Sequence, residues 1–348
     1  MPVGAIKNKL KNHILPYFKM PDRKPVLVQA REMWRLYRKY GRLPTQYLAN
    51  MLYRRCAPSD VMSFMPSALL KNLQNELNDP NANEIADDKF QFRRTLAAQG
   101  FPVIHELFRI LDSGEIRNAD DQVIDESAAR HIIDAHNAPV FVKLIGGSFG
   151  AEAFILPAGA NRDRLFVDRT GFIVQPVLEQ HETLASLNPE TINGIRIDTL
   201  LIGDRCISSG AILKIGTGDA VVDNGGQGGL LIQVDIETGQ LVGRARQKAR
   251  FGPGVYLRHP ETDAPFVGLK IPFWDQLRAL VAKAARALPQ LPTLGWDVGL
   301  TPTGPVLIEA NRRWQIESMQ SGETGIGDTP VGRAALSLDR RGRVEPFG

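Results

Sequence analysis

Apolar residues follow a helical period in the first part of the chain. Within residues 31–40 they recur at steps of three and four, namely at Met33, Trp34, Tyr37 and Tyr40. This spacing predicts an amphipathic helix, which Gly41 and Pro44 then interrupt. The pattern resumes in a further short helix and ends at the polar stretch 78–88. We therefore predict a short helical N-terminal segment over residues 1–85.

Helical and strand patterns alternate after residue 85. The helical period covers residues 88–100, 126–136 and 273–288. Short β-branched or alternating runs, separated by glycine and proline, predict strands at 138–145, 165–178, 195–203, 206–216, 228–242 and 295–311. The pattern indicates an α+β protein with mixed or antiparallel sheets. We expect two lobes, over residues 86–175 and 176–327, and a loose tail over 328–348.

The composition is that of an ordinary globular protein. Of 348 residues, 43% are hydrophobic and 23% are charged, which excludes a disordered or collagen-like chain. Cys56 and Cys206 are the only cysteines, so neither a disulfide scaffold nor a cysteine-rich zinc site is expected. The sequence shows neither a signal peptide nor an apolar run long enough for a membrane span. We expect a cytoplasmic protein.

Positive charge is concentrated at the N-terminus. Residues 1–75 contain 14 Lys and Arg but only three acidic residues, Asp22, Glu32 and Asp60. Basic helices of this kind either contact a more acidic body of the same protein or present a surface to an anionic partner. We therefore expect packing on the body, or a peripheral membrane or partner-protein contact through residues 1–75. No nucleic-acid-binding module is visible, and the oligomeric state is open.

Asp297, Glu309 and Asn311 form a candidate metal site. The turn around Gly304 predicts a hairpin that brings the second strand back beside the first. Glu309 and Asn311 are two residues apart, so on a strand both side chains face the same way. Two carboxylates and an amide oxygen are hard ligands that suit Mg²⁺. The alternative is an edge hairpin with solvated acidic side chains.

Lys143 ends an apolar strand and is followed by a glycine-rich loop containing Gly146, Gly147, Ser148 and Gly150. Glycines let successive backbone N–H groups turn toward an anion, and the lysine adds a positive charge. The spacing matches neither the Walker motif nor the dinucleotide-binding fingerprint. The loop is therefore either a flap over nucleotide phosphates or a hairpin without a ligand.

Two further segments carry polar groups at positions of interest. Arg196 lies on a predicted strand beside Asp198, either as a functional cation or as a surface ion pair. Asn224, Gly225 and Gly226 belong to a polar glycine-rich loop that is either a turn or part of a site.

The order of these features resembles the ATP-grasp superfamily between Asp88 and Gln320. The features are an Asp-Lys helix, a strand lysine with a glycine loop, a hinge strand, an arginine strand and a hairpin with the Asp…Glu-x-Asn pattern. The segments at 192–201, 257–274 and 295–311 are similar to the sugar-transfer-associated ATP-grasp proteins. These are related to carboxylate–amine ligases of the ribosomal-protein glutamate ligase type. The resemblance implies two α+β lobes that clasp ATP, preceded here by the basic helical segment.

The resemblance assigns nucleotide-binding roles to specific positions. Lys89 matches the lysine that reaches the α-phosphate, and Lys143 matches the second nucleotide lysine. Residues 146–150 match the flap over the phosphates. Gln175 and Val177 match the hinge strand that meets adenine, and either Glu179 or Glu182 is implied to hold the ribose.

The resemblance also implies the chemistry. Asp297, Glu309 and Asn311 match a triad that holds one or two Mg²⁺ ions, with Mn²⁺ able to substitute. Arg196, assisted by Lys214, matches the catalytic cation. The implied activity is ATP-dependent ligation of a carboxylate to an amine, or to a thiol, through an acyl phosphate. The setting would be natural-product or surface-polysaccharide biosynthesis.

An anionic substrate is implied by the remaining polar residues. These candidate substrate contacts are Asn224, Gly225, Gly226, Arg250, His259 and Arg312, with His259 either a base for the amine or a structural residue. The same motifs also fit a kinase that phosphorylates a hydroxyl group. A third alternative is a nucleotide-binding scaffold in polysaccharide assembly.

Overall fold

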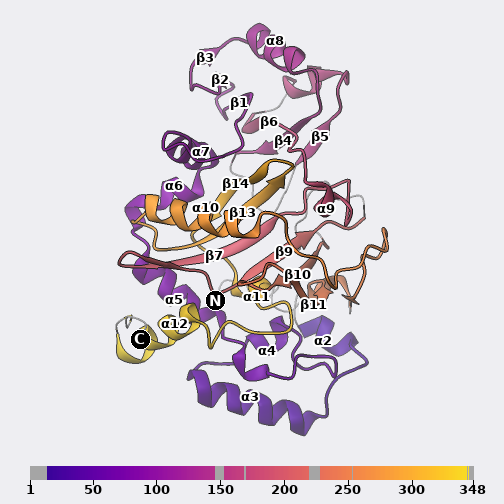
Figure 1. Ribbon diagram of the computed structural model, residues 1–348, viewed down its shortest axis with the longest axis vertical. Coiled ribbons are helices and arrows are strands. Elements are labelled where there is room, and N and C mark those ends of the chain that lie inside the picture. The colour runs from indigo at the N-terminus through magenta and orange to yellow at the C-terminus, as the bar shows by residue number, and fades with distance from the viewer. Residues whose placement is uncertain are drawn as a thin grey trace.

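Two antiparallel sheets and their covering helices make up the protein (Figure 1). A computed structural model describes residues 14–145, 153–167, 170–218, 228–252, 254–342 and 344. The helices are α2 (Leu15–Lys19), α3 (Val26–Tyr40), α4 (Gln46–Ala49), α5 (Ser67–Leu77), α6 (Asn83–Asp87), α7 (Lys89–Ala97), α8 (Glu126–His136), α9 (Glu182–Ala185), α10 (Trp274–Ala287), α11 (Ile316–Met319) and α12 (Pro330–Arg341). No helix within these ranges has the length and apolar character needed to cross a membrane.

The smaller lobe is a six-stranded sheet with the order β3-β2-β1-β6-β4-β5. Its strands are β1 (Phe108–Ile110), β2 (Ile116–Asn118), β3 (Val123–Ile124), β4 (Val140–Leu144), β5 (Phe154–Leu156) and β6 (Phe172–Pro176). Helix α8 packs on it through Ala129 and Ile133, which are buried with Phe108 and Val142. Asp125 caps α8 by accepting a hydrogen bond from the Ala128 N–H at 2.8 Å.

The larger lobe contains an eight-stranded sheet with the order β12-β11-β10-β9-β7-β13-β14, and β8 pairs with β7. Its strands are β7 (Ile195–Ile202), β8 (Arg205–Ile207), β9 (Ala211–Ile215), β10 (Leu230–Val234), β11 (Leu241–Arg246), β12 (Val255–Tyr256), β13 (Thr293–Thr301) and β14 (Gly304–Asn311). Side chains alternate between its two faces. Ile195, Ile197 and Leu213 pack in one cluster with Leu277 and Val281 of α10. The side chains at the alternate positions of these strands therefore lie on the opposite face of the sheet.

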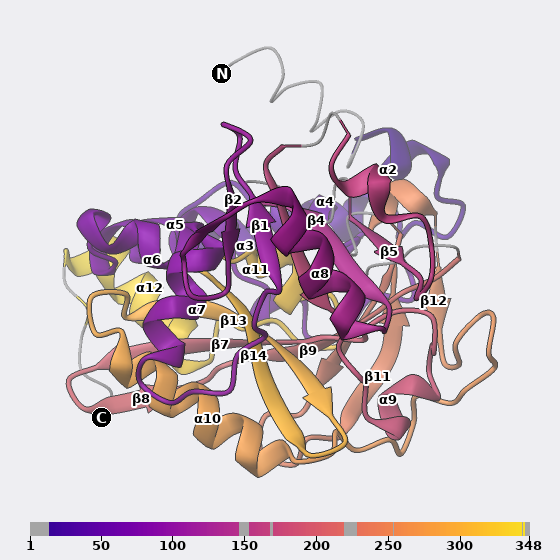
Figure 2. The same ribbon diagram turned by 90° about the horizontal axis from the view of Figure 1, so that it is seen from above.

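The N-terminal helices pack on the larger lobe. Figure 2 shows strands β7 and β9 between α10 on one side and helices α5, α11 and α12 on the other. Leu36, Leu69 and Leu73 are buried in one cluster with Ile316 and Val331. The described helices of the basic segment therefore pack on the body of the protein, which is the first of the two interpretations given above.

A close backbone approach joins the N-terminal helices to the segment after α11. The Gly327 N–H donates to the Ser63 carbonyl at 2.7 Å, and the Gly325 N–H donates to Ser63 Oγ at 2.9 Å. A Cβ atom at Gly325 would lie 2.3 Å from the Ser63 backbone. Glycine is therefore required at position 325, because any side chain would force the two segments apart.

Two predictions about local structure are wrong. Residues 330–341 of the expected loose tail form helix α12, which Thr329 caps and whose Val331, Ala334 and Ala335 are buried. Tertiary packing of this apolar face stabilises a helix that its short pattern did not reveal. Among the described residues of the run 165–178, only Phe172–Pro176 is a strand. Residues Arg162–Leu165 instead form a short 3₁₀ helix.

Candidate active site

A cavity of about 840 Å³ lies between the two lobes. Both sheets and the helix after Asp88 contribute to its wall. Most of the described residues proposed from the sequence for nucleotide, metal or catalysis line it, namely Lys89, Lys143, Gln175, Val177, Arg196, Lys214, Asp297, Glu309 and Asn311. Its volume is in the range of ordinary small-molecule sites.

The register of the large sheet brings the charged residues together. Asp297 on β13 lies opposite Arg196 on β7 and opposite Glu309 on β14. Directly opposed residues share a face, so all three side chains point into the cavity. Lys214 on β9 joins them, with its Nζ 3.3 Å from Asp297 Oδ1. The hairpin predicted from Gly304 is therefore confirmed.

A β-bulge sets the position of Glu309. Val298 pairs with Leu307, whereas the preceding residue, Asp297, pairs with Glu309. Ile308 is therefore an extra residue on β14. Ile308 and Glu309 both line the cavity although they are adjacent in sequence. A regular strand would turn one of them away. The bulge thus places the second carboxylate beside the first.

The two carboxylates have opposite electrostatic environments. Burial favours the neutral form of Asp297, but the charges of Arg196 and Lys214 outweigh it and hold the pKa of Asp297 well below its usual range. Arg196 Nε donates to Asp297 Oδ1 at 2.8 Å. Burial and the neighbouring Asp297 charge raise the pKa of Glu309. Asp297 is therefore the more readily ionised member of the pair.

The donor set fits a hard cation. Asn311 Nδ2 lies 3.2 Å from Glu309 Oε1 and 3.4 Å from Asp297 Oδ2, so the three side chains meet at one point. No cluster of three or more His, Cys, Asp or Glu side chains occurs in the described part of the chain. The candidate site therefore consists of two carboxylates and one amide. A cation here would relieve the repulsion that raises the pKa of Glu309.

The two lysines meet at the other side of the cavity. Lys89 Nζ donates to the Ile145 carbonyl at 2.9 Å, directly before the glycine loop. Burial, together with the charge of Lys89 and against the opposing charge of Glu309, lowers the pKa of Lys143 to about 8. Residues 146–150, which include Gly146, Gly147, Ser148 and Gly150 of the expected flap, lie outside the described residues.

If Lys143 contacts nucleotide phosphates, as the resemblance implies, its lowered pKa predicts a nucleotide affinity that depends on pH. Lys143 is charged below about pH 8 and loses its charge above it. Affinity for a fluorescent ADP analogue, measured by titration without metal, should therefore fall above pH 8 by up to about tenfold per pH unit. Lys143→Arg keeps its charge and should remove the decline. The same decline in the arginine variant would contradict this assignment.

The hinge strand lies at the cavity but the two candidate ribose residues do not. Gln175 and Val177 line the cavity, as expected for a hinge. Glu179 and Glu182 are exposed and are not among the lining residues. Glu190, which the sequence did not single out, lies at the cavity instead.

The expected substrate residues are divided among different places. Arg312 lines the cavity, where it pairs with Asp87 at 2.6 Å. Arg250 lines a second cavity, described below. Asn224, Gly225 and Gly226 lie outside the described residues.

His259 has a structural position. Its ring is buried, its Nε2 donates to the Gly216 carbonyl at 2.9 Å, and its Nδ1 accepts from the Thr262 N–H at 3.3 Å. Because both ring nitrogens are engaged and the side chain lies away from the cavity, the structure does not bring His259 to a position from which it could act as a base.

Lys248 is a cavity residue that the sequence did not reveal. It follows β11 and lines the cavity beside Leu231, Arg313 and Gln315. Burial lowers the pKa of Lys248, and the nearby charges of Arg250 and Arg196 lower it further. No local motif marks this lysine, because only the pairing of strands β9 to β11 brings it near Arg196.

Asp198 lies two residues beyond Arg196 and is fully buried. It accepts backbone hydrogen bonds from Gly210 at 2.5 Å and from Ser209 at 3.1 Å. Burial nevertheless raises the pKa of Asp198 to about 7, since hydrogen bonds from these N–H groups only partly compensate it.

The raised pKa of Asp198 predicts a loss of stability with rising pH. The folded protein holds this proton up to about pH 7, whereas the unfolded chain releases it near pH 4. The stabilising contribution is therefore complete below pH 4 and is lost as the pH rises to 7, by about 1.4 kcal/mol per unit at most. Urea unfolding at pH 5 and 8 should show a larger loss in the wild type than in Asp198→Asn. Equal losses would contradict the assignment.

Comparison with known proteins gives one family match. Residues 156–328 match the family described as sugar-transfer associated ATP-grasp. No curated protein sequence matches the chain.

Several solved structures are similar to this chain. ATP-grasp ligase PsnB complexed with minimal precursor has a TM-score of 0.45 and 15% identity, covering 80% of this chain and 68% of that one. The VanG D-Ala:D-Ser ligase from Enterococcus faecalis has a TM-score of 0.42 and 13% identity, covering 70% and 59%. N5-carboxyaminoimidazole ribonucleotide synthetase from Thermotoga maritima has a TM-score of 0.38 and 15% identity, covering 71% and 48%. The chain thus spans about half to two thirds of the length of such proteins.

Proposed function

We propose that this chain, which matches the sugar-transfer associated ATP-grasp family over residues 156–328, is an ATP-dependent carboxylate–amine ligase. The observation that carries the proposal is the meeting of Asp297, Glu309 and Asn311 with Arg196 in a cavity that also contains two lysines. Neither a solvated edge hairpin nor a surface ion pair accounts for it, because Asp297 is buried and faces the interior of the cavity.

The cavity suits a nucleoside triphosphate. Lys89 and Lys143 supply the positive charge for phosphates at the end of β4, and the segment with Gln175 and Val177 lines the part of the cavity where adenine would bind. Asp297, Glu309 and Asn311 would hold Mg²⁺, with Mn²⁺ able to substitute. Bound there, Mg²⁺ would neutralise phosphate charge.

The chain's own groups support transfer of the γ-phosphoryl group to a carboxylate. A substrate carboxylate oxygen attacks the γ-phosphorus, the bond to the β-phosphate oxygen breaks, and an acyl phosphate and ADP result. Arg196 and Lys214 place two positive charges beside this site and stabilise the negative charge that the reacting oxygens develop. An amine then attacks the acyl carbon, loses a proton and expels phosphate, which leaves an amide.

The family description supports a role in a pathway that builds a polysaccharide or a natural product, where the ligase would join a small acid to an amine. The substrate acid would carry additional negative charge, since Arg312, Arg313 and Lys248 line the same cavity.

The test is ADP release from Mg²⁺-ATP with pooled amino acids, uronic acids and short peptides in the presence of hydroxylamine. Hydroxylamine converts an acyl phosphate to a hydroxamate, whose mass identifies the acid. ADP with a hydroxamate is the expected result. ADP with a phosphorylated hydroxyl and no hydroxamate would replace the ligase with a kinase. Nucleotide binding without turnover in any pool would favour a scaffold.

A further inference from the structure

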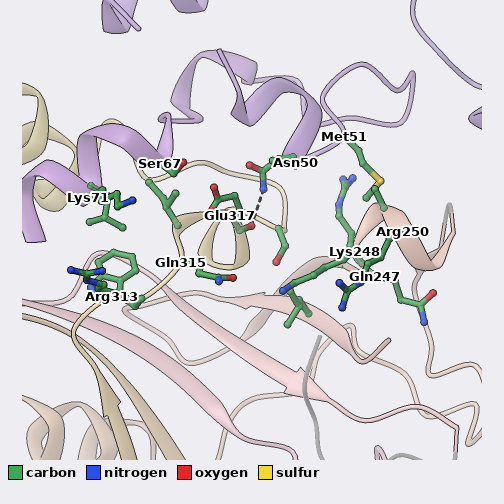
Figure 3. A pocket seen from close by; sticks show the side chains of 18 of the residues that line it. Asn50, Met51, Ser67, Lys71, Gln247, Lys248, Arg250, Arg313, Gln315 and Glu317 are labelled. Atoms are coloured by element: carbon green, nitrogen blue, oxygen red, sulfur yellow. Dashed lines mark hydrogen bonds between the residues drawn. The ribbon is translucent and has the colours of Figure 1, made fainter. Parts of the chain in front are cut away.

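A second cavity of about 710 Å³ lies between the N-terminal helices and the large sheet. Figure 3 shows Asn50, Ser67 and Lys71 of the N-terminal segment on one side, and Lys248 and Arg313 on the other. The segment around Glu317 completes the wall. The cavity therefore exists only because the N-terminal helices cover this part of the sheet.

The wall of the second cavity is strongly basic. Among the described residues that line it, Glu317 is the one acidic residue, against five cationic side chains, those of Lys71, Arg246, Lys248, Arg250 and Arg313. Cations gathered around one enclosed space repel each other and attract an anion with more than one charge. Arginine in particular binds carboxylates through paired hydrogen bonds.

Arg246 shows an unmet requirement for an anion. Its side chain is buried, with 2% of the residue exposed, and none of its guanidinium nitrogens has a hydrogen-bond partner in the described part of the chain. Its closest acidic group, Glu323 Oε1, is 3.5 Å from Nη2. Asn50 Oδ1, on the opposite wall, is also buried without a partner there. Buried polar groups in folded proteins are normally hydrogen-bonded, so this arrangement indicates a missing ligand.

The second cavity adjoins the first at its metal end. Leu231, Lys248, Arg313 and Gln315 line both. On the sheet, Leu231 pairs with Lys214 on one side and with Arg246 on the other. Only strand β10 therefore separates Lys214, which lies beside Asp297, from Arg246, whose guanidinium has no hydrogen-bond partner in the described part of the chain. A ligand in the second cavity would lie next to the site of phosphoryl transfer.

We propose that the second cavity binds the carboxylate substrate, a small acid with at least two negative charges, and that the N-terminal helical segment is the substrate-binding part of the enzyme. One carboxylate would pair with Arg246, and the reacting carboxylate would extend past Lys248 toward Arg196 and Lys214. The inference rests on the proposed ligase function for its chemistry, but its binding test does not require turnover.

The test uses tricarballylate, a small tricarboxylate, as the probe. It should raise the melting temperature of the full chain by about 2 °C or more at ten times its Kd, whereas sodium chloride at equal ionic strength should not. Arg246→Gln should remove the rise. If that variant does not fold, the exposed pair Lys71→Gln and Arg313→Gln should reduce it, and Arg278→Gln on α10 is the matched control.

Competition with the fluorescent ADP analogue, measured without metal, locates the probe. Simultaneous binding of both is expected. Displacement of the analogue by tricarballylate would overturn the inference. So would a melting temperature that tricarballylate does not raise, or one that it raises equally in the cavity variants. Failure of the ligase function would instead appear as absent hydroxamate while tricarballylate still binds through Arg246.

Helix α3 carries a second, independent feature, an exposed apolar stripe. Figure 1 shows α3 at the end of the molecule opposite the small lobe. Leu27 is 84% exposed, Val26 75%, Trp34 59% and Tyr37 51%. At 100° per residue these side chains share one side of the helix, while Leu36 and Tyr40 on another side are buried.

Arginines border the apolar stripe. Arg31, Arg35 and Arg38 are exposed along one edge of it, and the Arg38 guanidinium lies 5.2 Å from the Trp34 ring. Apolar side chains bordered by arginine complement an anionic bilayer surface, where the former enter the acyl boundary and the latter meet the headgroups. We propose that α3 attaches the protein to an anionic lipid surface.

Trp34 is itself the probe for this attachment. The other three tryptophans, Trp274, Trp296 and Trp314, are buried. Phosphatidylglycerol vesicles should shift the fluorescence emission to shorter wavelength, and phosphatidylcholine vesicles should not. Leu27→Ser should weaken the shift, and Val267→Ser, at an exposed apolar position elsewhere, should not. If the vesicles cause no shift of the emission, the proposal is overturned. If the emission instead shifts with protein concentration in the absence of vesicles, a protein contact replaces the lipid surface.

Discussion

Glu309→Gln is expected to reduce ATP-dependent turnover by about a thousandfold or more while leaving the protein at least as stable as the wild type. Loss of a metal ligand removes several kcal/mol of transition-state stabilisation, and each 1.36 kcal/mol corresponds to a factor of ten. Stability should not fall, because burial and Asp297 already disfavour the charged form of Glu309. A neutral amide of the same shape relieves that cost.

Steady-state ADP release and urea unfolding check both parts of this prediction. Glu237→Gln, at an exposed position in the turn between β10 and β11, is the matched control. Full activity of Glu309→Gln with Mg²⁺ would contradict the metal assignment. A large loss of stability would contradict the electrostatic assignment.

Asp297→Asn is expected to have the opposite effect on stability, lowering the free energy of unfolding by about 3 kcal/mol. Asp297 neutralises Arg196 and Lys214 at the bottom of the cavity. Its removal takes away the carboxylate that pairs with these two half-buried cations, and loss of one member of such a charge cluster is costly. Turnover should also be lost.

The measurement is urea unfolding of Asp297→Asn beside Glu309→Gln at pH 7. Adding Arg196→Met to Asp297→Asn should restore part of the stability, because it removes one of the uncompensated charges. Equal stability of the two single variants would show that the carboxylates do not differ in the way described.

The sequence predicted those features that depend on local spacing. The i, i+2 relation of Glu309 and Asn311 and the turn at Gly304 were sufficient to predict the hairpin, because strand geometry fixes which side chains share a face. Helix α8, predicted over residues 126–136, followed from the same kind of local information.

Features that depend on distant contacts were not predictable. Lys248 and Arg246 reach the cavities through the pairing of β9, β10 and β11, which no short motif encodes. Helix α12 has a short apolar face that is stable because α5 covers it. His259 has a side chain suited to catalysis, but its hydrogen bonds to the Gly216 region give it a structural position.

The placement of positive charge on the N-terminal helices also depends on how they fold. Their positive charge is visible in the sequence, yet it is distributed between two different surfaces. Lys71 faces the second cavity, whereas Arg31, Arg35 and Arg38 border the exposed stripe of α3. Overall charge therefore could not distinguish a contact with the body from a contact with a partner.

The bulge at Ile308 has an arithmetic consequence. In a hairpin with a two-residue turn, such as the one between Thr301 and Gly304, facing residues are always separated by an odd number of positions. Asp297 and Glu309 are twelve apart, an even number, and still face each other. Parity alone therefore requires one additional residue between them. An even separation between two site residues across such a turn reveals a bulge before any coordinates exist.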